Sequence, residues 1–157
     1  MPPFSTSWRA RLLLLDVNVL VYAHAEDAPR HLEHRDWLRQ MVESESAYGI
    51  SDLVLSGFLR VVTNPRAFDA PMSMERALAA AEALRSRPNC VVVSPAERHW
   101  EIFGRLCRET GVKGNLVPDA YFAALAIESG SEWITTDRDY SRFPGLNWRH
   151  PLDRASK

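Results

Sequence analysis

Short apolar runs alternate with longer amphipathic stretches along this chain. The runs contain no regular polar alternation, which is typical of strands that are buried on both faces of a parallel sheet. We therefore predict strands at residues 12–15, 47–50, 90–93 and 133–135, with a short last strand within residues 146–149.

Apolar residues recur at helical spacing between these runs. The pattern predicts helices at residues 30–44, 52–63, 73–85, 94–110 and 120–129. Residues 22–29 are expected to turn the chain from the first strand into the first helix. The segment Ser94-Pro95-Ala96-Glu97 has the features of a capping box and predicts a helix start at Ser94. This alternation predicts an α/β fold, in which helices cover both faces of a mostly parallel sheet of four to five short strands.

Composition narrows the classes of protein. With 157 residues, 46% hydrophobic and 25% charged, the chain is expected to form one domain over residues 1–157, with residues 1–11 as a loose extension. No apolar run has the length of a membrane span, and Asp16 and Asn18 interrupt what could be a signal peptide, so a cytoplasmic protein without a membrane partner is expected. A net charge of −1 means that a nucleic-acid partner would need a local basic face.

Polar side chains follow the predicted strands. Because the carboxyl ends of parallel strands lie at one edge of a sheet, these side chains can converge there. The acidic members would repel one another by about 4 kcal/mol per pair at about 4 Å, so they favour a bound cation. Oxygen ligands favour Mg²⁺ or Mn²⁺, which serve phosphodiester hydrolysis. The candidates are Asp16, Asn18, Ser51, Asp52, Asp119, Thr136, Asp137 and Asp139.

Each candidate also has a structural interpretation. Asp16 can cap a helix, and Asp119 suits the positive end of a helix dipole. One of Asp137 and Asp139 is expected to be a solvated turn residue, and Asn18 can bond to local backbone. A second group of side chains could bind phosphate at the rim of a site, although each alone is typical of a solvated surface: Arg60, Arg66, Arg108, Lys113, Arg138 and Arg142.

Four stretches of the chain, in order, resemble the PIN-domain nucleases, and specifically the VapC-type toxins of bacterial toxin–antitoxin pairs. They are LDVNVL at 15–20, SDLVLSGFLRVVTN at 51–64, PDAY at 118–121 and TTDRDY at 135–140. The resemblance implies a three-layer α/β/α fold and a magnesium-dependent endoribonuclease that cuts structured RNA such as tRNA or rRNA. It also implies a homodimer that is inhibited by a small cognate antitoxin.

The resemblance also implies roles for individual residues. Asp16 and Asp119 match the principal metal ligands of the family and Asp137 matches a further acidic position, so these three are expected to hold Mg²⁺ and to act in catalysis. Asn18 and Thr136 match supporting polar groups, and Asp139 matches only loosely. Many PIN domains carry a glutamate where this chain has Gly57, which leaves three carboxylates and leaves open whether one metal ion or two are bound.

Two alternatives remain open from the sequence. Asp16-Val17-Asn18 after an apolar strand also resembles the nucleophile motif of haloacid-dehalogenase-like phosphatases, although a second aspartate and a lysine at a strand end are missing. Gly57 is also compatible with a PIN-like module that binds RNA or protein without cutting it. The expected nuclease reaction leaves a 5′-phosphate and a 3′-hydroxyl, as the resemblance implies.

Overall fold

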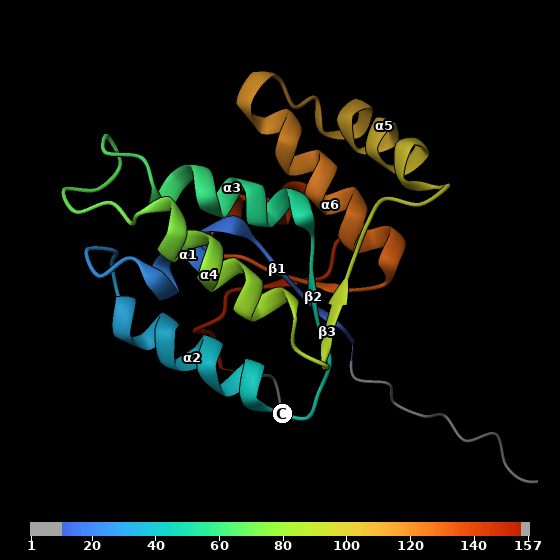
Figure 1. The fold of residues 1–157 in the computed structure, drawn as a ribbon. Helices are drawn as coiled ribbons and strands as arrows, with labels where there is room; N and C mark the ends of the chain where they lie inside the picture. Colours follow the sequence, from blue (N-terminus) through green and yellow to red (C-terminus); the bar gives the residue numbers. More distant parts are fainter. Residues whose placement is uncertain (1–10, 155–157) are drawn as a thin grey trace, which may run out of the picture.

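Five short parallel strands form one sheet in the order β3-β2-β1-β4-β5 (Figure 1). The computed structural model describes residues 11–154. The strands are β1 (Leu13–Leu15), β2 (Tyr48–Ile50), β3 (Cys90–Val92), β4 (Glu132–Ile134) and β5 (Trp148–Arg149). The predicted sheet of four to five parallel strands is therefore confirmed. The expected loose extension at residues 1–11 lies, except for Arg11, outside the described residues.

Helices flank the sheet and complete a three-layer α/β/α arrangement (Figure 1). Helix α1 packs on α2 and α3, α3 packs on α4, and α5 packs on α6. The helices are α1 (Val17–His24), α2 (His31–Glu43), α3 (Asp52–Val62), α4 (Met74–Arg85), α5 (His99–Thr110) and α6 (Val117–Ser129), with 3₁₀ turns η1 (Gly114–Leu116) and η2 (Arg138–Arg142). No helix within residues 11–154 is long and apolar enough to cross a membrane.

Helix α1 was not expected from the sequence. Three valines at residues 17, 19 and 21 favour an extended backbone locally, and residues 22–24 were assigned to a turn. Instead, Oδ1 of Asp16 accepts a hydrogen bond from the backbone N–H of Val17 at 2.7 Å, which caps a helix directly after β1. The backbone N–H of Asp16 also donates to the carbonyl of Ile134 at 2.9 Å, so the cap is fixed beside β4.

Helix α5 begins at His99, not at Ser94 as the capping box predicted. The side chain of Glu128 on α6 takes the role that the local motif would have had. Its two carboxylate oxygens accept hydrogen bonds from the backbone N–H groups of Ala96 and Arg98, both at 2.8 Å. A contact between helices thus decides where α5 begins, and a sequence window cannot contain that information. Helix α6 also starts earlier than predicted, with Pro118 in its first turn.

The sheet places the ends of β1 and β4 side by side. Leu15 pairs with Ile134 in a parallel register, so the residues that follow both strands leave the sheet at the same edge. Leu14, Leu15, Trp133 and Ile134 are fully buried and fix both strands in the core. The polar residues after these strands are therefore held on a rigid base.

Candidate active site

A cleft of about 650 Å³ opens at the carboxyl edge of the sheet. Asp16 reaches it from the end of β1, Asp119 from the first turn of α6, and Asp137 from the segment after β4. Asn18 on α1 also lines it. The structure thus brings together, in one cleft, the three carboxylates and the amide that the sequence singled out.

Asp16 is the most buried of these carboxylates, with 5% of its surface exposed. Burial raises its pKa to about 7, while hydrogen bonds from Thr135 and Val17 oppose the rise and the charges of Asp119 and Asp137 add to it. The helix-capping role considered from the sequence is real, because Oδ1 caps α1. The same side chain also lines the cleft, so the capping role does not exclude a functional one.

The hydroxyl group beside Asp16 belongs to Thr135, which no pattern in the sequence singles out. It donates to Oδ2 of Asp16 at 2.7 Å and accepts from the backbone N–H of Asp137 at 3.0 Å and from Nδ2 of Asn18 at 3.4 Å. Thr136, which was selected, contributes its backbone N–H to Oδ1 of Asn18 at 3.2 Å. The signal that could have identified Thr135 is the strand register, because Asp16 and Thr135 each follow a residue of the Leu15–Ile134 pair.

Asp119 and Asp137 are partly buried and each has a partner. The hydroxyl of Tyr140 donates to Oδ1 of Asp119 at 3.2 Å. Burial raises the pKa of Asp119, the Tyr140 hydrogen bond lowers it, and the charge of Asp137 raises it again. Oδ1 of Asp137 accepts from the backbone N–H of Asp139 at 2.9 Å and so caps η2.

Two other acidic candidates lie away from the cleft. Asp139 is exposed and forms an ion pair with Arg142 at 3.6 Å. Asp52 forms an ion pair with Arg85 on α4 at 2.8 Å. Neither side chain lines the cleft. Ser51, the remaining candidate after β2, caps α3 by accepting from the backbone N–H of Leu53.

The donor set of the cleft suits a hydrated cation. Across residues 11–154, no three His, Cys, Asp or Glu side chains stand close enough to form a ready metal-binding group. The cleft carboxylates offer oxygen atoms only, and the raised pKa values of Asp16 and Asp119 reflect in part a mutual repulsion that a cation would relieve. Mg²⁺ keeps several water ligands and binds one or two carboxylates directly, so a further carboxylate would contact it through water. These residues therefore fit Mg²⁺, whereas zinc prefers nitrogen and sulfur ligands.

Gly57 lies on α3 against Val17 of α1. A Cβ atom at position 57 would lie 2.9 Å from Cγ2 of Val17, which is too close for an ordinary contact. Val17 therefore occupies the space that the first side-chain atoms of a glutamate at position 57 would need. The absence of a side chain at position 57 thus allows α1 and α3 to pack closely.

Among the basic residues that could bind phosphate, Arg60 lines the cleft. Within the described part of the chain it has no acidic partner at ion-pair distance. Arg138 and Arg142 are instead paired with Asp153 and Asp139. Among the described residues, the cleft thus combines carboxylates with the guanidinium of Arg60, which is available to a ligand.

Comparisons with known proteins identify the family of this chain. The PIN domain family model matches residues 13–146. The chain is 43% identical to VapC ribonuclease Mb2897 of Mycobacterium bovis, over 90% of this chain and 97% of that protein. It is 35% identical to ribonuclease VapC25 of Mycobacterium tuberculosis, over 89% of this chain and 99% of that protein.

Solved structures show the same fold. VapBC2 of Rickettsia felis, bound to a DNA fragment from its promoter, matches with a TM-score of 0.65 and 19% identity, over 88% of this chain and 98% of that one. VapC20 of Mycobacterium tuberculosis, described as a sarcin-ricin loop cleaving toxin, matches with a TM-score of 0.61 and 17% identity, over 85% and 98%. At these identities the structures establish the fold, whereas the sequence matches establish the family. The chain belongs to the PIN domain family and, within it, to the VapC ribonucleases.

Proposed function

We propose that this protein is the toxin component of a type II toxin–antitoxin system and that it cuts RNA as a metal-dependent endoribonuclease. The observation that carries the proposal is the meeting of Asp16, Asp119 and Asp137, from three separate segments, in one cleft that an arginine also lines. The family's named ribonucleases support the same reaction.

Asp16, Asp119 and Asp137 would hold Mg²⁺, or Mn²⁺ in its place. A bound ion of this kind supplies charge neutralisation at the phosphate and a more acidic water. Thr135 holds Asp16 in place, and Asn18 in turn donates to the Thr135 hydroxyl. Tyr140 holds one oxygen of Asp119. Arg60 binds a phosphate oxygen through charge-assisted hydrogen bonds. Attack of water in line with the P–O3′ bond breaks that bond and leaves a 5′-phosphate and a 3′-hydroxyl.

Thr136 and Asp139 have supporting roles in this proposal, and both act through the backbone. The N–H of Thr136 holds the Asn18 side chain, and the N–H of Asp139 holds one oxygen of Asp137. Their side chains are therefore expected to matter less than those of Thr135 and Asp16.

The proposed partners are a structured RNA substrate, such as tRNA or rRNA, a small cognate antitoxin and a second copy of the chain. The structural neighbours include VapBC toxin–antitoxin complexes, which supports the antitoxin. The homodimer and the cytoplasmic site of action are proposed from the family resemblance alone.

The test is to map RNA 5′ ends after induced expression of the wild type and of Asp16→Ala. We expect new 5′-phosphate ends at defined positions with the wild type and none with the variant. Asp52→Asn is the control, because it also removes a carboxylate but lies outside the cleft. Equal cleavage by wild type and Asp16→Ala would overturn the proposed site.

A catalytically silent RNA- or protein-binding module is the second candidate, and Gly57 favours it because this position cannot supply a carboxylate. Calorimetric titration with Mn²⁺ separates the nuclease from the silent module. A nuclease site should bind Mn²⁺ and lose this binding in Asp16→Ala, whereas a silent site should show no such binding. The haloacid-dehalogenase-like alternative gains no support, because no lysine among residues 11–154 lines the cleft. Trapping an aspartyl-phosphate on Asp16 would revive it.

A further inference from the structure

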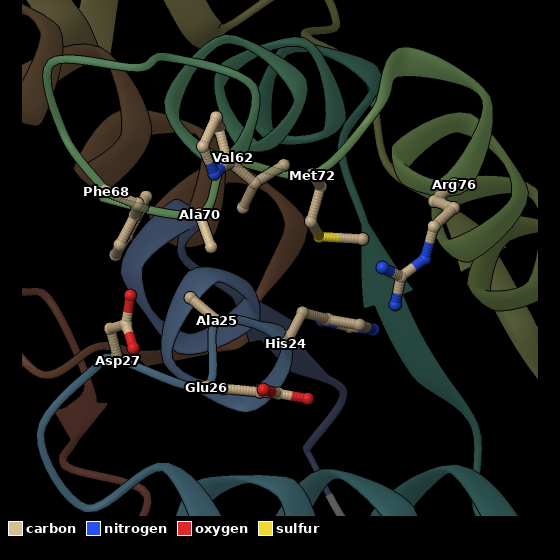
Figure 2. A pocket seen from close by; sticks show the side chains of 10 residues that line it. His24, Ala25, Glu26, Asp27, Val62, Phe68, Ala70, Met72 and Arg76 are labelled. Atoms are coloured by element: carbon tan, nitrogen blue, oxygen red, sulfur yellow. The ribbon is translucent and has the colours of Figure 1, made fainter.

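Phe68 lines two neighbouring cavities. One is the cleft that holds the carboxylates, and the other is a smaller pocket of about 180 Å³ (Figure 2). The smaller pocket lies between the end of α1, the end of α3 and the loop of residues 63–73. Phe68 is therefore the side chain that the cleft and the pocket share.

The ring of Phe68 is partly buried against the core, and within residues 11–154 it has no aromatic partner. Within residues 11–154 every other phenylalanine pairs with an aromatic ring: Phe58 with His24, Phe103 with Trp100 and Tyr121, Phe122 with Trp133, and Phe143 with Tyr140. An unpaired ring at the border of a polar cleft is available to stack on a flat ligand.

The loop that carries Phe68 is held by its own hydrogen bonds. Oδ1 of Asn64 accepts a hydrogen bond from the backbone N–H of Arg66 at 2.9 Å, and the backbone carbonyl of Asn64 accepts one from the N–H of Phe68 at 3.4 Å. The N–H of Met72 donates to the carbonyl of Val62 at 2.8 Å and closes the loop. Phe68 is thus presented in a preorganised position, which reduces the entropy lost on binding.

Polar groups surround the rest of the pocket. Figure 2 shows Arg76 projecting in from α4, and Glu26 and Asp27 on the segment after α1, with the Asp27 carboxylate directed toward the Phe68 loop. Ala25, Val62 and Met72 add an apolar lining. An apolar pocket with hydrogen-bond acceptors, a donor and a free aromatic ring matches the two faces and the polar edge of a nucleobase.

We propose that Phe68 and this pocket form a subsite for one unpaired nucleobase of the RNA, next to the phosphate that is cut. The proposal rests on the proposed function for the identity of the ligand. A nucleobase is favoured over a peptide because the pocket shares Phe68 with the cleft of the carboxylates and Arg60, where the phosphate is placed. Since Glu26 and Asp27 accept hydrogen bonds, a base with an exocyclic amino group is preferred to uracil.

A binding experiment tests the subsite without cleavage. The protein carries Asp16→Asn, and the probe is a single-stranded RNA of randomised sequence with one central 2-aminopurine, whose fluorescence falls when it stacks on an aromatic ring. We expect quenching that Phe68→Leu reduces, with affinity weakened about fivefold or more. Phe68→Tyr keeps a ring and should restore the quenching. Trp100→Leu, which removes an aromatic side chain that is 76% exposed and outside the pocket, should change nothing.

A cleavage experiment adds the base preference. Wild type, Phe68→Leu, Phe68→Tyr and Trp100→Leu cut a randomised RNA pool, and the cut ends are sequenced. We expect Phe68→Leu to lose the preference at one position beside the cut, while Phe68→Tyr and Trp100→Leu keep it. Thermal melting of each variant identifies any loss of fold. Equal quenching and equal preference in Phe68→Leu and wild type overturn the subsite. Quenching without any cleavage by the wild type overturns the proposed reaction and leaves the subsite standing.

Discussion

Asp16 is a carboxylate with almost no solvent contact, and its hydrogen-bond donors, the Val17 N–H and the Thr135 hydroxyl, are both neutral. Burial raises its pKa from 3.8 to about 7. Between these two values the folded chain binds a proton that the unfolded chain has released. Stability without metal therefore falls as the pH rises through this window, by an amount on the order of 4 kcal/mol once the pH exceeds 7.

Asp16→Asn should therefore stabilise the metal-free protein while it abolishes cleavage. The amide carries no charge at any pH, and its oxygen can still accept from the Val17 N–H. In EDTA at pH 8 we expect Tm to rise by about 5 °C or more over the wild type, and the difference should shrink toward pH 4. Differential scanning calorimetry across this range measures it.

Asp139→Asn is the control for this change. It is an equally small substitution at an exposed carboxylate, 73% exposed at the side chain, and it should leave Tm within about 1 °C at every pH. If Asp16→Asn lowered Tm at pH 8, the buried charge would not be the cost that we infer.

Thr135→Val separates the two adjacent threonines. Valine keeps the shape of the side chain but removes the hydroxyl, which leaves Oδ2 of Asp16 and the N–H of Asp137 without this partner. We expect unfolding free energy to fall by about 1–3 kcal/mol and metal affinity or cleavage to fall about 10- to 100-fold. Urea denaturation and calorimetry with Mn²⁺ measure the two effects.

Thr136→Val should be close to neutral, because the contact of Thr136 with Asn18 is made by its backbone. Thr135→Ser should keep most activity, since it retains the hydroxyl. A larger loss of metal affinity in Thr136→Val than in Thr135→Val would reverse this assignment and return the supporting role to the residue selected from the sequence.

At the scale of elements, the strands and most helices could be predicted because their own residues decide them. The buried runs of β1 and β4 and the amphipathic stripes of α2, α3 and α4 are local patterns. Helix α1 was missed because its valines favour a strand, whereas its N-cap, Asp16, is fixed by a contact with β4. The predicted start of α5 at Ser94 is wrong for a similar reason, because Glu128 on another helix accepts hydrogen bonds from the backbone just before α5.

The site shows the same division. The carboxylates could be found from the sequence because a charged residue at the end of a buried strand has little structural reason to be there. The choice between Thr135 and Thr136 depends on strand register, which no local pattern contains. The pocket beside Phe68 depends on the packing of a loop against the ends of α1 and α3, and no motif in the chain marks it.

The contact between α1 and α3 yields a prediction about helix packing. Gly57→Ala would improve helix propensity but would place a methyl group 2.9 Å from Cγ2 of Val17, whose β-branched side chain has little rotamer freedom in a helix. We expect a net destabilisation of about 1–2 kcal/mol by urea denaturation. Adding Val17→Ala should recover part of this loss, which a double-mutant cycle would show as coupling.

Gly104→Ala on α5 is the matched control. The nearest neighbour of a Cβ there is the flexible end of Arg108 at 3.4 Å, so this substitution should stabilise the protein by about 0.5–1 kcal/mol. A similar gain from Gly57→Ala would show that α1 and α3 are not closely packed, and Gly57→Glu could then be made without moving Val17.

At the scale of the whole molecule, the carboxylates that the proposed activity needs destabilise the fold when no metal is bound. The sheet gathers Asp16, Asp119 and Asp137 from three segments, and burial and like charge raise the pKa values of the first two. The large core around Leu14, Trp133 and their neighbours holds these groups in place despite the repulsion. A bound cation should then stabilise the entire fold and not only the site, because the native state alone binds it.

Thermal melting with increasing Mn²⁺ tests this linkage. At pH 7.5 we expect Tm of the wild type to rise with metal concentration. The free energy of unfolding should increase by about 2.7 kcal/mol at a metal concentration 100 times Kd. Below pH 7 the ion must displace the proton of Asp16, so the midpoint should move to higher metal concentration, by about tenfold for each pH unit. Asp16→Asn should lose most of the response at both pH values, whereas Asp139→Asn should keep it. An equal rise of Tm in Asp16→Asn would place the cation elsewhere on the molecule and separate metal binding from the carboxylate that begins α1.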